Sequence, residues 1–240
     1  MMYMGGKHKL SKAIVPIITA GMKPEQWYVE PFCGGCNVID KVPGHRRIAA
    51  DNHYYLINMW QAVKHGWIPP DTVTEAEYGH IKDNPGQYDP ALVGFVGFGC
   101  SWGGKWWGGY ARTDRTGKKS RNYAGEACRS VLAKAPLLVD VRFVCNKYWN
   151  LGRIYLPRNS RIYCDPPYAA TTGYNSDFDH ELFWQWVRNM TTDGHEVYVS
   201  EYTAPEDFDC IWEKSVANNL AKSEDGRSGK AIERLFIYGG

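Results

Sequence analysis

The 240-residue sequence has no apolar run approaching the roughly 18 residues that a membrane-spanning helix needs. It also has no internal repeat, and no low-complexity segment apart from one run rich in glycine and tryptophan. These absences argue against a membrane-spanning, solenoid or disordered chain. Because 44% of the residues are hydrophobic and 14% are aromatic, the chain can bury one sizeable core with an inserted lobe.

Cysteine is present, but not in a pattern typical of a metal site or a disulfide framework. The seven cysteines are scattered, and the single Cys-x-x-Cys pair, Cys33 and Cys36, has no second pair or histidine doublet at ligand spacing. We expect no metal site, and thiols without disulfides in a reducing compartment. Three lysines precede AIVPIITAG near the N-terminus, but this apolar part is short and Pro16 interrupts it. We therefore expect a buried amphipathic helix, no export, and a cytoplasmic protein.

The chain as a whole has no large excess of positive or negative charge, and its formal net charge is +2. The distribution is uneven, however, because residues 100–161 contain thirteen basic and three acidic side chains, whereas residues 162–240 contain six and fourteen. A solvated polar face is the simplest interpretation of a charged run. An imbalance of this size within one segment nevertheless indicates a polyanionic partner.

Alternating strand and helix patterns predict an α/β fold. We expect strands at 27–31, 47–51, 141–145, 161–164, 196–202 and 234–239. Helices are expected at about 9–20 and 179–190; the second has Asp179 as its N-cap and an apolar face formed by Leu182, Phe183, Trp186, Val187 and Met190. Between about 60 and 138 the pattern loses its period. Strands that alternate with helices form a mostly parallel, doubly wound sheet whose ligands bind at the carboxyl ends of the strands.

Three candidate ligand-binding sequences fall at such strand ends. The first predicted strand runs into Phe32-Cys33-Gly34-Gly35-Cys36-Asn37, where glycines permit a tight turn and close approach to a ligand. Asp51 ends the next strand about 20 residues later, where nucleoside-binding folds place a carboxylate for ribose hydroxyls. Asp165-Pro166-Pro167-Tyr168 ends a later strand, because the prolines cannot continue a strand ladder.

These motifs, in this order, resemble those of a known enzyme family. The Asp-Pro-Pro-Tyr sequence, the Glu-Pro-Phe-x-Gly-Gly turn at 30–35 and the N-terminal Tyr-x-Gly-Gly-Lys at 3–7 are similar to motifs of Dam-like adenine-N6 DNA methyltransferases, including phage-borne members. The motif order is that of the family's alpha group. Residues 143–151 and 230–238 also look like family segments. The chain departs from the family at Cys36, where glycine is usual, and at Glu201, where asparagine is frequent.

The resemblance implies a Rossmann-like, S-adenosylmethionine-dependent methyltransferase sheet with an inserted DNA target-recognition lobe. It assigns residues 1–59 and 139–240 to the catalytic domain and residues 60–138 to the recognition region. A monomeric enzyme acting on double-stranded DNA is implied, in a bacterial or phage-infected cytoplasm, with restriction-modification and phage self-protection among its possible roles. The implied cofactor is S-adenosyl-L-methionine, and the implied cofactor-binding residues are Tyr3, Gly5, Gly6, Lys7, Glu30, Pro31, Phe32, Cys33, Gly34, Gly35, Asp51, Tyr148 and Asp165.

Within this set, individual roles follow from the resemblance and from residue type. Asp51 would accept bonds from the ribose hydroxyls, Tyr148 would flank the cofactor adenine, and Tyr3 and Lys7 would close the methionine side. Packing alone would equally account for both tyrosines, which are often half-buried. An exposed lysine after two glycines has no obvious structural role, which favours a functional one for Lys7.

The Asp-Pro-Pro-Tyr sequence suits a reaction at an exocyclic amino group, and the implied catalytic residues are Asp165, Pro166, Pro167 and Tyr168. The lone pair of the adenine amino group is delocalised into the ring, so the group must be held through both N–H bonds and turned towards a methyl sulfonium. The Asp165 carboxylate supplies one acceptor, and the Pro166 carbonyl, released from ladder pairing by the turn, supplies the other. Tyr168 offers a face on which an extruded base can stack.

The segment 94–125 is the expected DNA reader. Its glycines allow close approach, its aromatic side chains can stack on or wedge between bases, and its basic side chains can contact phosphates or guanine edges. We expect at least one tryptophan to form a small satellite core instead. The candidate DNA-binding residues are Trp102, Lys105, Trp106, Arg112, Arg115, Lys118, Lys119 and Arg121.

Two other functions fit parts of this pattern. A methyltransferase acting on RNA or on a protein glutamine would need the same two acceptors, although the motif order and the basic insert argue against it. A catalytically idle DNA-binding protein on the same scaffold would not need Asp165 and Asp51. The target sequence is not implied by the resemblance.

Overall fold

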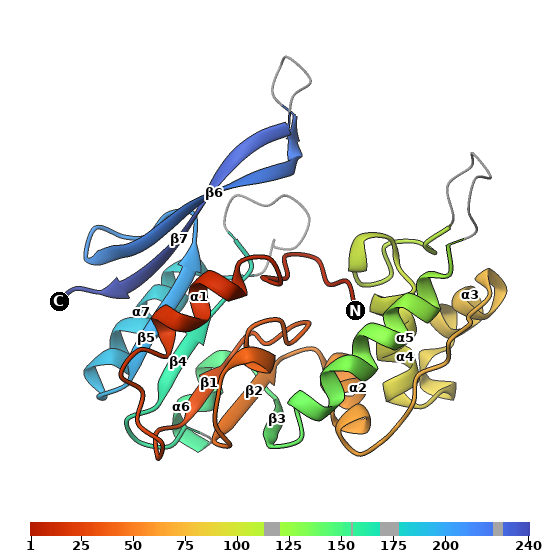
Figure 1. The fold of residues 1–240 in the computed structure, drawn as a ribbon, viewed down its shortest axis with the longest axis horizontal. Coiled ribbons are helices and arrows are strands. Elements are labelled where there is room, and N and C mark those ends of the chain that lie inside the picture. Colours follow the sequence, from red (N-terminus) through yellow and green to blue (C-terminus); the bar gives the residue numbers. More distant parts are fainter. Residues whose placement is uncertain (113–120, 155, 169–177, 223–227) are drawn as a thin grey trace. The chain divides into compact units, whose positions relative to one another are not determined.

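The computed structural model describes residues 1–112, 121–154, 156–168, 178–222 and 228–240. Within these residues, seven strands form one sheet in the order β3-β2-β1-β4-β5-β7-β6 (Figure 1). The β2–β3, β1–β4 and β4–β5 pairs are parallel, whereas β7 runs antiparallel to both β5 and β6. The expected α/β class with a mostly parallel, Rossmann-like sheet is therefore confirmed.

The chain divides into two compact units, which are described one at a time. Unit 1 comprises Met1–Gly21 and Cys33–Tyr148, and unit 2 comprises Met22–Phe32 and Trp149–Gly240. The predicted division into 1–59 with 139–240 and an insert at 60–138 stays a prediction.

Unit 1 contains two parallel strands and most of the helices. The strands are β2 (Arg47–Asp51) and β3 (Val141–Cys145), in register from Arg47 opposite Val141 to Asp51 opposite Cys145. Both coincide with the predicted runs at 47–51 and 141–145. The helices and short 3₁₀ turns of this unit are α1 (Ser11–Ile18), η1 (Ile39–Lys41), α2 (Tyr54–Lys64), α3 (Glu75–Asp83), η2 (Pro85–Gln87), α4 (Pro90–Gly99), η3 (Trp102–Gly104), α5 (Tyr123–Lys134) and η4 (Ala135–Leu137).

The segment that appeared aperiodic in the sequence is largely helical. Helix α4 packs against both α2 and α5 (Figure 1). Helix α4 is buried over nearly all of its length, so its sequence PALVGFVGFG shows no amphipathic alternation. Its glycines allow the close packing, because a Cβ at Gly94 would lie 2.2 Å from the Tyr55 carbonyl oxygen. Helix α3 begins with a capping box between Thr74 and Glu77.

Unit 2 contains the remaining strands, and their ends match the predictions unevenly. Its elements are β1 (Tyr28–Glu30), α6 (Tyr148–Ile154, which begins at the last residue of unit 1), β4 (Arg161–Cys164), α7 (His180–Thr192), β5 (Glu196–Glu201), β6 (Phe208–Lys222) and β7 (Ser228–Tyr238). Strand β4 has the predicted bounds. Strand β7 is longer than predicted, and β6 was not predicted. Only residues 234–236 of β7 pair with β5, so the rest of the β6–β7 ribbon extends beyond the sheet (Figure 1).

Helix α7 confirms the predicted N-cap and most of the predicted apolar face. The Asp179 side chain accepts a hydrogen bond from the Leu182 backbone nitrogen at 2.9 Å. Phe183, Trp186, Val187 and Met190 are buried as expected. The expectation for Leu182 was wrong, because its side chain is exposed and Trp184 extends the buried stripe instead.

None of the seven cysteines, all of which lie in the described part of the chain, forms a disulfide. Among the described residues, no group of three or more His, Cys, Asp or Glu side chains is placed to hold a metal ion. No described helix has both the length and the apolar character that crossing a membrane requires.

Candidate active site

In unit 1, the glycine-rich turn is hydrogen-bonded to Asp51 at the end of β2. One Asp51 oxygen accepts a hydrogen bond from the Gly34 backbone nitrogen at 3.1 Å, and the other accepts one from the His53 backbone nitrogen at 3.0 Å. The Cys33 nitrogen also donates to the Ala50 carbonyl at 2.9 Å. Two sequence-predicted groups are thus brought together at the carboxyl end of one strand.

The carboxyl group of Asp51 is electrostatically unusual. Burial raises its pKa from 3.8 to about 6, and the backbone hydrogen bonds from His53, Gly34 and Asn52 oppose this rise only in part. Each side-chain oxygen accepts one of the two backbone bonds just described, and a carboxylate oxygen has about two lone-pair positions. The group therefore retains capacity to accept bonds from ligand hydroxyls.

The N-terminal motif lies against this turn. A Cβ added at Gly34 would lie 2.6 Å from the Tyr3 ring, so only glycine permits this contact. The φ angle of Gly34 is 45°, a left-handed conformation that also favours glycine. Gly5 has φ 77°, and its carbonyl oxygen is 3.4 Å from the Lys7 ammonium. Lys7 was expected to be exposed, but it is buried within unit 1.

Tyr148, the residue predicted to flank the cofactor adenine, is buried at the start of α6. His53 lies next to Asp51 in the structure, although the sequence did not single it out. His53 caps α2, and burial lowers the pKa of its imidazole to about 4. Its ring contacts Phe98 and Trp106, with centroids 4.9 and 4.2 Å away.

In unit 2, the ends of β1 and β4 lie side by side, because Tyr28 is opposite Arg161 and Val29 is opposite Ile162. This is the point where the strand order reverses, which is the usual ligand position in open α/β sheets. Glu30, at the end of β1, is buried and accepts a hydrogen bond from the Tyr28 hydroxyl at 2.8 Å.

The residues after Glu30 form part of the packing of unit 2. Pro31 is buried, and Phe32 packs edge-on against Phe178 and Phe183, with ring centroids 5.9 and 5.8 Å away. These contacts fix the path of the chain as it leaves β1.

The Asp-Pro-Pro-Tyr sequence follows β4 directly, with Asp165 and Pro167 partly exposed and Pro166 buried. The Tyr168 hydroxyl donates to the Glu233 carboxylate on β7, at 2.8 Å from Oε2 and 3.2 Å from Oε1. The rings of Tyr168 and Tyr202 pack in a T-shaped arrangement at a centroid distance of 4.7 Å. Burial, together with the nearby Asp165 and Glu233 carboxylates, raises the pKa of the Tyr168 hydroxyl well above 10.

Several acidic side chains converge around β4. Burial raises the pKa of the Tyr163 hydroxyl, and the negative charges of Asp165, Glu30 and Glu233 add to this rise. Sequence reasoning missed Glu233, because it is 65 residues from its partner Tyr168 and lies in the part of β7 before residue 234, which was not predicted as strand. Glu201, the second departure from the family pattern, is also buried, and its Oε1 accepts a bond from the Tyr202 nitrogen at 2.8 Å.

Apart from Trp106, the predicted DNA-binding residues fall into three groups in the structure. Trp102 and Lys105 are exposed, and the Trp102 side chain is 64% accessible. Arg112 and Arg121 are also exposed, but they form ion pairs with Glu75 and Glu126, the latter at 2.6 Å. Arg115, Lys118 and Lys119 lie outside the described residues.

Trp106 differs from the other predicted DNA-binding residues because its ring packs within unit 1. It stacks on Tyr55 at 5.7 Å and lies so close to α4 that a Cβ at Gly97 would be 2.2 Å from it. This matches the expectation that at least one tryptophan contributes to a satellite core. Its contact with DNA stays a prediction.

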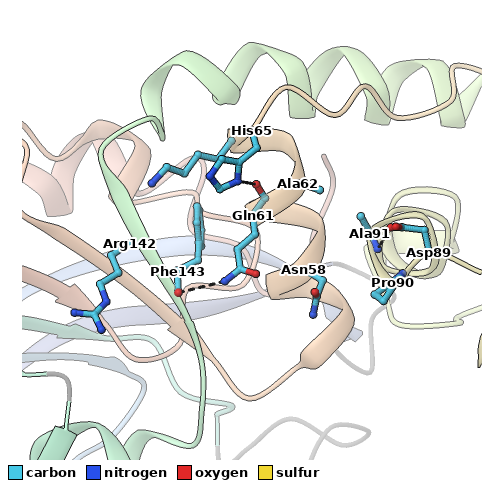
Figure 2. A pocket seen from close by; sticks show the side chains of 10 residues that line it. Asn58, Gln61, Ala62, His65, Asp89, Pro90, Ala91, Arg142 and Phe143 are labelled. Carbon is cyan, nitrogen blue, oxygen red and sulfur yellow. Dashed lines mark hydrogen bonds between the residues drawn. The ribbon is translucent and has the colours of Figure 1, made fainter.

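A cavity of about 580 Å³ in unit 1 contains none of the predicted site residues (Figure 2). The polar side chains around it hold α2 and β3 together, since Gln61 donates to the Phe143 carbonyl at 3.4 Å and Lys64 donates to the Val141 carbonyl at 2.9 Å. His65 and Asp89 form local bonds within or at the start of their own helices.

Fold and site together define an α/β protein with a Rossmann-like sheet and ligand-type residues at the carboxyl ends of β1, β2 and β4. Residues 3–89 match the family model for D12 class N6 adenine-specific DNA methyltransferases. The Type II methyltransferase M.FokI of Planomicrobium okeanokoites is 24% identical over 205 residues, which are 78% of this chain and 31% of M.FokI.

The solved structure described as SMU.472, "a putative methyltransferase complexed with SAH", superposes with a TM-score of 0.40 and 13% identity, over 98% of this chain and 52% of that one. The chain thus spans about a third of the length of M.FokI and about half of SMU.472.

Proposed function

We propose that the chain is a site-specific DNA adenine methyltransferase that transfers a methyl group from S-adenosyl-L-methionine to the N6 amino group of adenine in double-stranded DNA. The observation that carries the proposal is the position of Asp165-Pro166-Pro167-Tyr168 at the carboxyl end of β4, where the strand order reverses. The match of residues 3–89 to an adenine-specific family model supports the same substrate.

Unit 1 supplies a suitable binding surface for the nucleoside and amino-acid parts of the cofactor. The partly buried Asp51 carboxylate fits ribose hydroxyls, and Gly34 and Gly35 allow the backbone to approach the ligand closely. Tyr3 contacts the same turn, and Lys7 belongs to the same N-terminal motif as Tyr3. Both residues are proposed to close the methionine end of the cofactor site. When bound, S-adenosylmethionine supplies an electrophilic methyl group.

Unit 2 contains the residues that are proposed to bind the adenine base. The Asp165 carboxylate and the Pro166 carbonyl accept the two N–H bonds of the adenine amino group and direct its lone pair towards the methyl group. With S-adenosylmethionine bound, the Asp165 carboxylate would stabilise the positive charge that develops on the amino nitrogen during methyl transfer. Tyr168 provides a stacking face whose orientation is held by Glu233 and Tyr202. No strong general base is needed, because the amine loses its proton readily after methylation.

The finer assignments are also proposals. The motif order supports a Dam-like enzyme of the alpha group, and the type II methyltransferase relative is consistent with a restriction-modification context. We further propose a monomeric cytoplasmic enzyme, phage-borne or prophage-borne, whose segment 60–138 reads the target.

The test is methyl transfer from labelled S-adenosylmethionine to duplex DNA, RNA and a glutamine-containing protein by the purified chain. We expect label in duplex DNA, recovered as N6-methyladenine, and loss of transfer in Asp165→Ala with nearly unchanged cofactor affinity. Activity of Asp165→Ala within tenfold of the parent would contradict the assigned role. Label confined to RNA or protein would favour the alternative substrates, and cofactor binding without transfer would favour an idle DNA-binding protein.

A further inference from the structure

A buried lysine connects helix α5 to the glycine-rich turn of unit 1. Lys134 is the last residue of α5 and is only 6% exposed. Its ammonium donates to the Cys36 carbonyl oxygen, to Asn37 Oδ1 at 3.1 Å and to Asp40 Oδ2 at 2.7 Å. A lysine ammonium has three N–H donors, so these three acceptors account for its full donor capacity.

The residue held by Lys134 has an unusual backbone conformation. Cys36 is fully buried and has φ 50°, in the left-handed region that residues with a side chain rarely adopt. Glycine adopts such angles without steric cost. At Cys36 the conformation therefore depends more on external contacts, and the hydrogen bond from Lys134 to its carbonyl is one of them.

The second acceptor, Asn37, extends the effect of Lys134 to the predicted cofactor-binding residues. The Asn37 amide nitrogen lies 2.4 Å from the position that a Cβ would take at Gly6, and 2.9 Å from that at Gly35. The amide thus touches both the N-terminal motif and the turn. The bond from Lys134 to Asn37 Oδ1 fixes the orientation that allows these contacts.

The third acceptor keeps the lysine charge compensated, and it also makes a substitution feasible. Asp40 accepts from Lys134 through Oδ2 and from Lys41 through Oδ1, the latter at 2.7 Å. Removal of the Lys134 ammonium therefore leaves Asp40 with a cationic partner. A neutral residue at position 134 does not strand a buried charge, which is the usual reason that such variants fail to fold.

We propose that Lys134 is a positioning residue that sets the glycine-rich turn for the cofactor by compensating for a side chain at position 36. The proposal rests on the proposed function, because it takes this turn to be the cofactor cradle. It also gives α5, which belongs to the predicted recognition region 60–138, an influence on cofactor affinity.

The experiment measures binding of S-adenosylhomocysteine, which cannot turn over, to the full-length chain by calorimetry. The variants are Lys134→Met, Cys36→Gly and the double variant. We expect Lys134→Met to weaken binding at least tenfold and Cys36→Gly to bind like the parent. In the Cys36→Gly background, Lys134→Met should cost less than threefold, because glycine adopts the turn conformation without help.

Two further variants separate positioning from general destabilisation. Val131→Ala removes a fully buried side chain from the same helix, and its affinity should stay within twofold of the parent despite a lower Tm. Asn37→Ala removes the contacts to both glycines but leaves the Lys134–Asp40 pair, and we expect about fivefold weaker binding. This second variant tests the same link if Lys134→Met does not fold.

Each unfavourable outcome has a distinct meaning. Equal losses from Lys134→Met in the parent and in the Cys36→Gly background would overturn the proposal, as would a loss in Val131→Ala as large as that in Lys134→Met. Unchanged binding in Lys134→Met or, where that variant does not fold, in Asn37→Ala would also overturn it. A parent chain that does not bind S-adenosylhomocysteine would refute the cofactor assignment itself, and this proposal with it.

Discussion

Cofactor affinity should depend on pH through Asp51. The pKa of this carboxyl group is raised to about 6, because burial disfavours the charged form more than the backbone hydrogen bonds favour it. Ribose hydroxyls bind best to the ionised carboxylate, which forms charge-assisted hydrogen bonds. Only about a tenth of the groups are ionised at pH 5. We therefore expect affinity for S-adenosylhomocysteine to fall about tenfold between pH 7.5 and pH 5.

Ionisation of Asp51 has opposite effects on ligand affinity and on the free energy of unfolding. Because the folded-state pKa lies above the unfolded value of 3.8, ionisation of Asp51 reduces the free energy of unfolding as pH rises from about 4 to about 6. Ligand affinity rises over the same window. Nearby groups do not imitate the effect: the pKa of His53 is lowered to about 4, and the pKa of the Cys145 thiol is raised by burial and by Asp51, so both stay mostly neutral from pH 5 to 8.

The assay is calorimetric titration of the parent and of Asp51→Asn at several pH values between 5 and 8. The variant should bind about tenfold or more weakly at pH 7.5, since charge-assisted bonds contribute roughly 1.5–3 kcal/mol, and its affinity should be almost independent of pH. Titration of the ligand's own groups affects both proteins and cancels in the comparison. Parallel pH profiles for the two proteins would refute the role of Asp51.

Two other predictions concern the base and the DNA backbone. Tyr168→Phe keeps the ring but loses the bond to Glu233, so kcat for methylation should fall less than tenfold, whereas Tyr168→Ala should lose the stacking face, roughly 1–3 kcal/mol, and about tenfold or more. Equal impairment of the two variants in steady-state assays would argue against stacking. Arg121→Gln should lower the slope of log affinity against log salt by about 0.9 on any duplex, whereas Glu126→Gln, which releases Arg121 from its ion pair, should strengthen binding. Anisotropy titrations at several salt concentrations measure both, and unchanged slopes would exclude Arg121 from phosphate contact.

The parallel strands were the most predictable part of the fold. The bounds of β2, β3 and β4 coincide with the predicted runs, because buried parallel strands are short, largely apolar runs that end sharply at polar residues or prolines. Strand β6 gave no such signal. The consecutive residues Asp209, Cys210 and Ile211 are all exposed, because β6 lies at the edge of the sheet beside β7.

The helices between β2 and β3 were missed for two different reasons. Helix α4 is buried all round and rich in glycine, so neither period nor propensity indicated it. Helix α3, in contrast, has the Thr74 and Glu77 of a capping box, a sequence signal that was available. The candidate site shows the same division. Asp51 and Asp165 followed from their places at strand ends, whereas Glu233 and Lys134 are defined only by tertiary contacts with distant residues.

The packing of unit 1 bears on how target reading and cofactor binding are related. Residues of the predicted recognition segment contact the cofactor-side motifs at three separate points: the Gly104 carbonyl accepts from the Met4 nitrogen at 3.3 Å, Phe98 packs on the Tyr3 ring at 5.2 Å, and Lys134 holds the Cys36 carbonyl. A segment that only presented side chains to DNA would need none of these contacts. If this segment binds DNA as proposed, any rearrangement on target binding acts on the same backbone that is proposed to hold the cofactor. Such a rearrangement would link the affinities for DNA and for S-adenosylhomocysteine, and each ligand would then change the affinity of the other by the same factor.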